Sequence, residues 1–498
     1  MIRQLLLGGA SALAFAAPFA AHAQSEPPAA TAPSSGLDTL VPADNAAPAA
    51  PAKTGDAVLD RLNELEAKVN ALEARNHELE SQAADTATRV QKVEVRAAKG
   101  VQPGVAPTFA DAGDNFSFHP RGTFQLDYAA YHQRAGGYDF NNGTDIRRAR
   151  FGFDGTAFKV FKYRIEAEFV KSTVNLLDAY IQYGGIPKLT FTIGQQKAPY
   201  GLEANSTDAL NTFLERGMAN NAFGAVGAER RVGATVAYNP IPSVIATVGL
   251  FGAGEAVQRT AATPGETYGV NGRVTWEPIL DTGRVLHLGV SGYHVSNFAG
   301  KAVTLSDRPN TRVDGGAIES VALAPITTGA IASQTRGVRD ATLYAAEGAG
   351  VFGPFSVQSE YQHLHVNRYG FVPDLNFSGY YAFGTVFLTG ESRAFKGGVV
   401  DRVKPRNDFD WSKGHWGAFE LAVRYDQLDL TEHDLSPLSR KAETYTAGIN
   451  WYLNSNLRYI FNYIRFKGLN SPLAVAPANV NGTTAKGDAY AMRMQWDF

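Results

Sequence analysis

The chain has no cysteine among its 498 residues, which excludes disulfide bonds, thiolate catalysis and cysteine-ligated zinc. Beyond its N-terminus it also lacks any run approaching the ~20 apolar residues that a membrane-spanning helix needs. Neither sign of charge is in excess, with 46 basic and 48 acidic residues. A nucleic-acid-binding protein would carry a basic excess, so we expect no nucleic-acid partner.

Motifs of catalysis are missing as well. The sequence has no Gly-rich phosphate loop, no Gly-x-Ser-x-Gly elbow and no metalloprotease helix. His363 and His365 share one face of an expected strand, but no third metal ligand stands near them in the sequence. Glu166 and Glu168 also share a face, where pairing with arginine is a commoner role than acid–base catalysis. We therefore expect no enzyme, no metal site and no cofactor.

The first 23 residues have the organisation of a secretory signal peptide. Arg3 supplies the positive start, residues 5–21 form an uncharged apolar run, and Ala21-His22-Ala23 is a small-x-small cleavage site. Glycine and proline interrupt the apolar run, which disfavours an uncleaved helical anchor. We expect the mature protein to leave the cytoplasm. Residues 24–55 are rich in Pro and Ala and are expected to form a flexible linker.

Residues 56–99 carry a heptad pattern typical of a coiled coil. One seam holds Leu62, Leu65, Val69, Leu72, Asn76, Leu79, Ala83, Thr86, Val90 and Val93. Opposite charges flank this seam at the offset that links parallel helices, in the pairs Arg61/Glu66, Lys68/Glu73 and Arg75/Glu80. The pattern predicts an oligomerisation segment in which Asn76 fixes the register. The alternative is a solitary amphipathic helix packed on a core.

From about residue 115 onward, large apolar and polar residues alternate in sixteen segments separated by turn residues. The segments are 116–132, 146–159, 161–171, 174–183, 188–196, 231–239, 243–252, 267–277, 285–295, 341–349, 355–362, 379–389, 418–430, 444–453, 456–466 and 485–498. An even number joined by short turns predicts an all-β fold, a closed antiparallel transmembrane barrel over 115–498. We expect the long connections 297–339 and 391–415 to be external loops.

The polar face of these segments must line the lumen of such a barrel, because a charge facing lipid costs roughly 2–4 kcal/mol near mid-bilayer. A soluble sandwich with this face in bulk water is the alternative. The basic residues expected to point inward are Arg121, Arg148, Arg150, Lys162, Arg164, Arg273, Arg424, Arg458 and Arg493. Of these, Arg148, Arg150, Arg164 and Arg458 are candidates for lining the pore and binding anions.

The connection at about 197–230 is unusually long for a link between two neighbouring strands. Asp208 is placed to cap a short helix whose Leu210, Phe213 and Leu214 share one face. Such a loop forms either a surface lid or a segment folded back into the barrel, where it would narrow the bore.

The region 115–498 resembles the phosphate-selective porin O and P family of Gram-negative outer membranes. The resemblance is carried by Phe118-His119-Pro120-Arg121-Gly122, Arg147-Arg148-Ala149-Arg150, Asp178-Ala179-Tyr180-Ile181, Gly194-Gln195-Gln196-Lys197-Ala198-Pro199, Phe213-Leu214-Glu215-Arg216, Arg230-Arg231-Val232-Gly233 and the terminal Phe498. It implies a homotrimer of 16-stranded barrels with the third external loop folded into each bore. It also implies Lys197, Arg216, Arg230 and Arg231 near the constriction, small anions such as phosphate as solutes, and recognition of Phe498 by the barrel-assembly machinery.

One departure bears on selectivity. The loop between Lys197 and Arg230 holds four carboxylates but only Arg216 as an interior base, and carboxylates beside arginines weaken an anion-attracting field. We therefore expect a passive outer-membrane porin that prefers anions. The alternatives are a nonspecific or sugar-admitting porin, and an envelope tether whose barrel mainly anchors the coiled coil.

Overall fold

The computed structural model describes residues 55–102 and 106–498, except 112, 114, 136–137, 227–228, 253–266, 297, 299–300, 326–335 and 473–483. The predicted signal peptide and all but the last residue of the predicted linker lie outside the described residues. The chain divides into two compact units, Met1–Arg89 and Val90–Phe498, which we describe separately. No helix in the described ranges combines the length and the apolar character needed to cross a bilayer.

Most of the first unit that the structure describes is one long helix, α1 (Ala57–Gly100). The seam residues Leu62, Leu65, Val69, Leu72 and Leu79 are 51–64% exposed in the single chain. Ion pairs on the helix surface join Glu64 to Arg61 and to Lys68. The predicted helix is confirmed. Its association with other copies stays a prediction, and the exposed seam is the surface that such association would bury.

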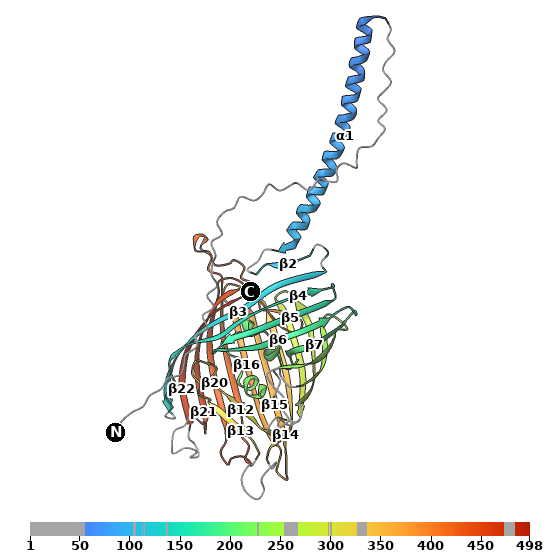
Figure 1. The fold of residues 1–498 in the computed structure, drawn as a ribbon. Coiled ribbons are helices and arrows are strands. Elements are labelled where there is room, and N and C mark those ends of the chain that lie inside the picture. Colours follow the sequence, from blue (N-terminus) through green and yellow to red (C-terminus); the bar gives the residue numbers. More distant parts are fainter. Residues whose placement is uncertain are drawn as a thin grey trace, which may run out of the picture. The chain divides into compact units, whose positions relative to one another are not determined.

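The second unit is a closed barrel of 16 antiparallel strands in which each strand pairs with the next along the chain (Figure 1). The strands are β3 (Phe116–Ala135), β4 (Gly143–Ala157), β5 (Phe161–Val170), β6 (Thr173–Tyr183), β7 (Leu189–Lys197), β8 (Arg230–Tyr238), β9 (Val244–Phe251), β10 (Tyr268–Asp281), β11 (Arg284–Ser296), β14 (Val338–Phe352), β15 (Phe355–Arg368), β16 (Leu375–Phe387), β19 (Ala418–Asp429), β20 (Lys441–Tyr452), β21 (Leu457–Leu469) and β22 (Thr484–Asp497). Each of the sixteen predicted segments coincides with one strand.

The barrel closes where β22 pairs with β3, from Lys486 opposite Ala135 to Asp497 opposite Thr123. Gly122 and the terminal Phe498 extend this seam by exchanging two backbone hydrogen bonds of 3.0 Å each. A Cβ atom on Gly122 would lie 2.6 Å from the Phe498 ring, so the close approach requires glycine here. Closure leaves the barrel without an unpaired strand edge.

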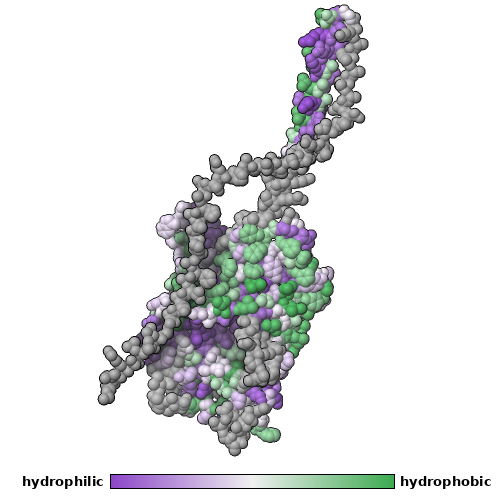
Figure 2. Space-filling model, in the orientation of Figure 1, coloured by the Kyte–Doolittle hydropathy of each residue, from purple (hydrophilic) through white to green (hydrophobic). Residues whose placement is uncertain are grey.

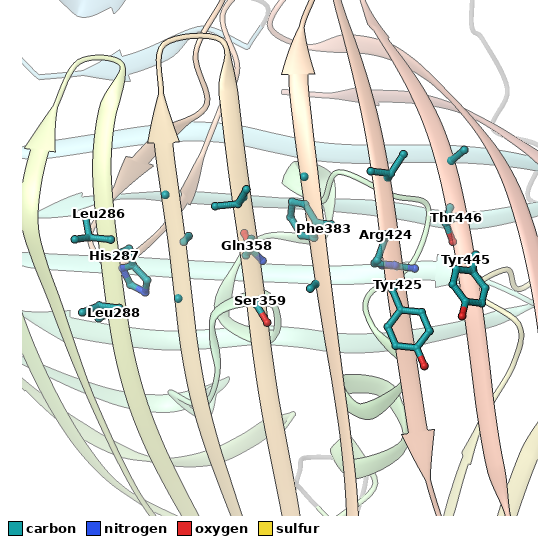
Figure 3. A pocket seen from close by; sticks show the side chains of 18 of the residues that line it. Leu286, His287, Leu288, Gln358, Ser359, Phe383, Arg424, Tyr425, Tyr445 and Thr446 are labelled. Atoms are coloured by element: carbon teal, nitrogen blue, oxygen red, sulfur yellow. The ribbon is translucent and has the colours of Figure 1, made fainter.

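Side chains alternate between the two faces of the barrel wall as the sequence predicts. On β19 and β20, Tyr425 and Tyr445 point to one side of the sheet and Arg424 and Thr446 to the other (Figure 3). Tyr445 is 56% exposed, whereas Arg424 is 3% exposed inside the barrel. The outer surface is accordingly apolar over the strands at the front of Figure 1, as Figure 2 shows. The predicted two-sided wall is confirmed, and the soluble sandwich is wrong.

Shorter elements complete this unit. They are β1 (Val101–Gln102) and β2 (Thr108–Ala110), the hairpin β12 (Val303–Asp307) and β13 (Glu319–Leu323), and the hairpin β17 (Ala394–Lys396) and β18 (Val399–Asp401) with the turn η3 (Trp411–Lys413). β2 pairs with both β1 and the beginning of β3, where Phe109 lies opposite Phe118.

The prediction that residues 391–415 form an external loop is wrong. The connection 388–417 joins β16 to β19 at the same end of the barrel as the short turns, where Leu388 donates to Phe419 and Phe387 donates to Pro354 of a two-residue turn. Length alone assigned this connection to the loop end. The order of the strands decides at which end of the barrel a connection lies. Antiparallel strands alternate in direction, so only every second connection lies at the loop end.

The two-sided wall predicts a depth-dependent cost for charge on the outer face. Val423 lies midway along β19 and is 63% exposed on the lipid side. We expect Val423→Arg to destabilise the barrel by about 2–4 kcal/mol in urea unfolding from lipid vesicles. Val423→Leu is the matched control and should change the unfolding free energy little. Equal stability of the Arg and Leu variants would contradict the assignment of this face to lipid.

Candidate functional site

Residues 198–226 fold inward and fill part of the bore, so the lid alternative is wrong. This inner loop contains α2 (Leu202–Asn205), η1 (Asp208–Leu210) and α3 (Met218–Gly224), seen as short green helices among the strands in Figure 1. Its large apolar residues Leu202, Phe213, Leu214, Met218 and Phe223 are at most 1% exposed.

Carboxylates on the lumenal wall hold the backbone of the inner loop. Glu360 on β15 accepts hydrogen bonds from the amides of Leu202 and Glu203 at 2.9 and 3.0 Å. Asp426 on β19 accepts from the amide of Met218 at 2.9 Å. These amides belong to the first turns of α2 and α3, whose own N-caps make no side-chain hydrogen bond. The wall therefore supplies the caps that the loop sequence lacks.

Asp208 does not cap a helix of Leu210, Phe213 and Leu214, as predicted. Asp208 begins only the single turn η1. The Asp208 carboxylate is instead bound by three arginines. Arg150 lies at 2.6 Å, Arg216 at 2.7 Å and Arg148 at 3.3 Å. These cations lower the pKa of Asp208 well below its usual value despite the burial that opposes ionisation. Guanidinium groups outcompete backbone amides as partners for this carboxylate.

A second carboxylate of the inner loop, Glu215, is bound by arginines in the same way. Arg147 donates to both of its oxygens at 2.7 and 3.0 Å, and Arg493 on β22 lies at 3.0 Å. Arg312, from the segment between β12 and β13, lies at 3.5 Å. Together the Asp208 and Glu215 clusters hold the inner loop to β4 and to β22. These two strands lie on either side of β3, next to the closing seam.

Several of the predicted pore residues are structural anchors in this arrangement. Lys197 donates to the carbonyls of Ala204 and Ser206, each at 2.9 Å. Arg458 donates to the carbonyl of Ala209 at 2.8 Å, and Arg231 donates to that of Gly252 at 3.0 Å. Arg148 and Arg216 are held by Asp208, as described above. These contacts place the five cations around the loop but direct much of their charge to protein oxygens.

A polar cavity of about 220 Å³ lies between the inner loop and the wall formed by β3 to β8. Its cationic lining residues are Arg121, Arg150, Arg164, Lys197 and Arg230, and its acidic ones are Glu166, Asp178 and Asp208. Four of the eight predicted pore residues meet here, namely Lys197, Arg150, Arg164 and Arg230. The cavity has an excess of two positive charges.

Two of these arginines are weakly paired. Around Arg164, the described residues place no carboxylate within 4 Å, and its guanidinium instead lies 5.8 Å from the centre of the Tyr180 ring. Arg121 approaches Asp154 and Glu166 only at 3.5 and 3.7 Å. By contrast, Arg230 forms a 2.8 Å ion pair with Asp178. The Nε atoms of Arg121 and Arg164 are buried without a protein acceptor among the described residues.

Two more segments enter the bore. From the loop end, Asn310 beyond β12 donates to Asp426 and Thr444 on the lumenal wall. From the turn end, the β17–β18 hairpin lies against the wall. The Phe395 ring is tilted against the His287 ring with centroids 5.7 Å apart, and the carbonyl of Gly398 accepts a hydrogen bond from Arg273. Val403, just past this hairpin, shares a small pocket with Ala209 of the inner loop. The bore is thus narrowed from both ends.

The site prediction omitted Arg121, Arg147 and Arg312. Arg121 alternates with outward residues on the first strand and is expected to point inward, so this alternation could have found it. Arg312 lies in a connection without periodicity, and no sequence signal identifies its contact with Glu215. His365, one of the two histidines that share a strand face without a third metal ligand nearby in sequence, hydrogen bonds to Asn367 and Asn376. The described part of the chain holds no group of three or more metal-ligating side chains.

Comparison with known proteins shows which family and which solved structures this chain is similar to. The family model described as phosphate-selective porin O and P matches residues 118–498. Porin O of Pseudomonas aeruginosa is 28% identical over 78% of this chain and 90% of its own length. An uncharacterized protein of Caulobacter vibrioides is 28% identical over 79% of this chain and 76% of its own length. An anion-selective porin from Comamonas acidovorans matches with a TM-score of 0.49 at 14% identity, covering 77% of this chain and all of that one.

The inner loop carries a titratable group whose ionisation should loosen it. Burial raises the pKa of Glu203 to about 7, although Arg424 at 4.0 Å favours the ionised form. The protonated form is favoured in the folded loop, so stability is lost as pH rises from about 4.5 to 7, by roughly 3 kcal/mol in all.

We expect single-channel current noise to increase between pH 5 and pH 8, and Glu203→Gln to abolish that increase. Glu229→Gln, which changes an exposed carboxylate at the end of the same loop, is the matched control and should behave like the wild type. Noise that changes with pH equally in all three proteins would exclude Glu203 as its origin.

Proposed function

Because this chain belongs to the phosphate-selective porin O and P family and forms an outer-membrane porin of Gram-negative type, we propose that it admits small anions such as phosphate by passive diffusion. Membership of this family indicates a channel rather than an enzyme. The observation that carries the anion preference is the cavity between the inner loop and the β3–β8 wall, with its weakly paired arginines.

Arg164 and Arg121 are the residues to which we assign anion contact. Arg164 has no carboxylate within 4 Å among the described residues, and the carboxylates nearest to Arg121 lie at 3.5 and 3.7 Å. Each guanidinium therefore keeps N–H donors in a planar fork that matches the oxygens of phosphate. Removing such a group from bulk water strengthens its attraction for an anion, and the position of these arginines beside the inner loop supplies that environment. The remaining cations hold the inner loop in place. They favour anions only through the part of their electrostatic field that neighbouring carboxylates leave uncancelled.

The carboxylates that bind the other arginines set the strength of this selection. Asp208 and Glu215 offset part of the positive charge of the six arginines that surround them. A weak to moderate anion preference follows, with solutes small enough to pass beside the inner loop. A nonspecific or sugar-admitting porin would show current independent of phosphate and no preference for either ion sign.

We further infer that the protein works as a homotrimer, held together in part by parallel association of α1 through its exposed seam. Terminal Phe498, which directly follows the closing strand β22, is the group that we assign to recognition by the barrel-assembly machinery. The predicted signal peptide, residues 1–23, accounts for export to the outer membrane.

Neutralising Arg164 tests the anion path. We expect Arg164→Gln to shift the reversal potential in a salt gradient toward zero, and to weaken inhibition of chloride current by added phosphate by roughly 10-fold or more. Arg465→Gln removes the same charge from an exposed position on the outward face of β21, and should leave both quantities unchanged. Equal effects of the two substitutions, or cation preference in the wild type, would overturn the proposal.

Deleting residues 56–99 separates the channel from the envelope tether. The barrel strands all lie outside this segment, so we expect the shortened protein to retain its single-channel conductance and its phosphate inhibition. If the protein is a tether, the shortened protein should lose its envelope phenotype, and its barrel would have no need to select between ions. Planar-bilayer recording of the wild-type and shortened proteins, together with an envelope-integrity assay in cells, distinguishes a channel from a tether.

A further inference from the structure

Two shallow apolar grooves adjoin on the outer wall of the barrel. The larger groove, of about 950 Å³, crosses β11 to β21, and its floor holds small outward residues, among them Gly348, Gly384 and Ala447. The smaller groove, of about 600 Å³, crosses β19 to β22 and β3, and it shares Val423 and Ala447 with the larger one. The outer face of a membrane barrel contacts hydrocarbon, so acyl chains occupy such grooves.

Tyrosines border the loop-end side of both grooves. Tyr425 and Tyr445 line the larger groove, Tyr463 lines both, and Tyr490 lines the smaller one. Ring centroids are 4.9 Å apart for Tyr425 and Tyr445, and 5.3 Å apart for Tyr463 and Tyr490. Figure 3 shows the hydroxyl groups of Tyr425 and Tyr445 directed along the strands toward the loop end. Such tyrosines mark the boundary between acyl chains and polar head groups.

Beyond this boundary, two lysines face each other on the outer wall. Lys467 on β21 lies directly opposite Lys486 on β22, and Tyr463 lies directly opposite Tyr490. The lysines are exposed, and each is four residues, or roughly 13 Å of strand, past the tyrosine on its own strand. Like charges at directly opposite positions of a sheet destabilise it. An anion held between the two lysines would remove this cost.

Carboxylates of the protein neutralise the lysine pair only in part. Among the described residues, Glu443 approaches Lys467 no closer than 3.9 Å, and no carboxylate lies within 4 Å of Lys486. The connections next to the pair, 470–483 and 136–137, contain no acidic residue in the sequence.

The nearest carboxylate on β22 is already occupied. Asp488 forms an ion pair with Arg134 on β3 and accepts a hydrogen bond of 2.7 Å from the Tyr463 hydroxyl. The Asp488 side chain is 2% exposed, whereas that of Arg134 is 45% exposed. The protein therefore presents cations to the head-group region at this point of the wall and keeps the carboxylate covered.

We propose that this surface binds an outer-leaflet lipid with a phosphorylated head group. A phosphate lies between Lys467 and Lys486, and the acyl chains of the same lipid lie in the groove below Tyr463 and Tyr490. Lysine ammonium groups bind phosphate as point charges, which suits a head group that retains some freedom of orientation. The site lies outside the lumen, so the inference is independent of the solute. Contact with bulk lipid, without selection of a head group, is the competing arrangement.

Lipid titrations followed by native mass spectrometry of the purified full chain test the head-group site. The probes are hexa-acylated lipid A with two phosphates and the same lipid without phosphate. We expect the wild type to prefer the phosphorylated lipid, and the double variant Lys467→Gln/Lys486→Gln to bind that lipid roughly 10-fold more weakly. Equal affinity of the wild type for the two lipids, or equal affinity of the wild type and the double variant for phosphorylated lipid A, overturns the proposal.

A matched double variant controls for the loss of charge. Lys159 and Lys188 are exposed lysines in turns at the opposite end of the barrel. We expect Lys159→Gln/Lys188→Gln to bind phosphorylated lipid A as the wild type does. The same loss of affinity in both double variants would overturn the assignment to Lys467 and Lys486. Folded protein is isolated in each case by its heat-modifiable migration.

Filling the groove separates a bound lipid from a bound free anion. Ala447 lines both grooves, and Ala447→Trp places a large ring in them while leaving both lysines in place. We expect this variant to bind phosphorylated lipid A several-fold more weakly than the wild type, because the acyl chains lose their contact with the wall. Unchanged affinity of the Ala447→Trp variant, or capture of inorganic phosphate by the lysines with no binding of lipid A, would overturn the proposal.

Discussion

Satisfaction of backbone hydrogen bonds in a medium without water is the constraint on which this structure depends. Within hydrocarbon, every strand needs a neighbour on both sides, and only a closed cylinder provides one. The hydrogen bonds between Gly122 and Phe498 complete that cylinder at its turn end, where an unpaired terminus would otherwise expose polar groups. Alternation of side chains then follows from the pleat, and it separates a lipid face from a lumen along all sixteen strands.

The lumen that closure creates is used mainly to hold charge. Asp208 and Glu215 draw arginines from β4, β22 and the segment after β12 into two buried clusters. Buried ion pairs are costly to form and costly to break, because loss of one partner leaves the other charge without compensation. These ion pairs consequently fix the inner loop in one position. Most arginines of the bore bind groups of the protein and are less available to a solute. We therefore assign anion selection to Arg164 and Arg121, the two arginines whose contacts with carboxylates are absent or long among the described residues.

The bore is narrowed from the loop end by the inner loop and the region around Asn310, and from the turn end by the β17–β18 hairpin. These segments meet the same wall through different chemistry. The inner loop is held by ion pairs and capped amides, whereas the hairpin is held by an aromatic contact of Phe395 with His287 and by a backbone carbonyl. Between these segments and the wall of β3 to β8 lies the cavity of about 220 Å³ that Arg164 and Arg121 help to line.

Sequence alone determined the export signal as a prediction, the heptad helix, the number of strands and the face on which each side chain lies. These properties follow from local periodicity, since the pitch of a helix and the pleat of a strand act over a few residues. Tertiary structure decided which cations are free. Nothing in the spacing of Arg148, Arg216 or Arg164 distinguishes them, yet Asp208 binds the first two and leaves the third. It also decided the side on which residues 388–417 lie and the partner of Asp208, because both depend on residues distant in sequence that only closure of the barrel brings together.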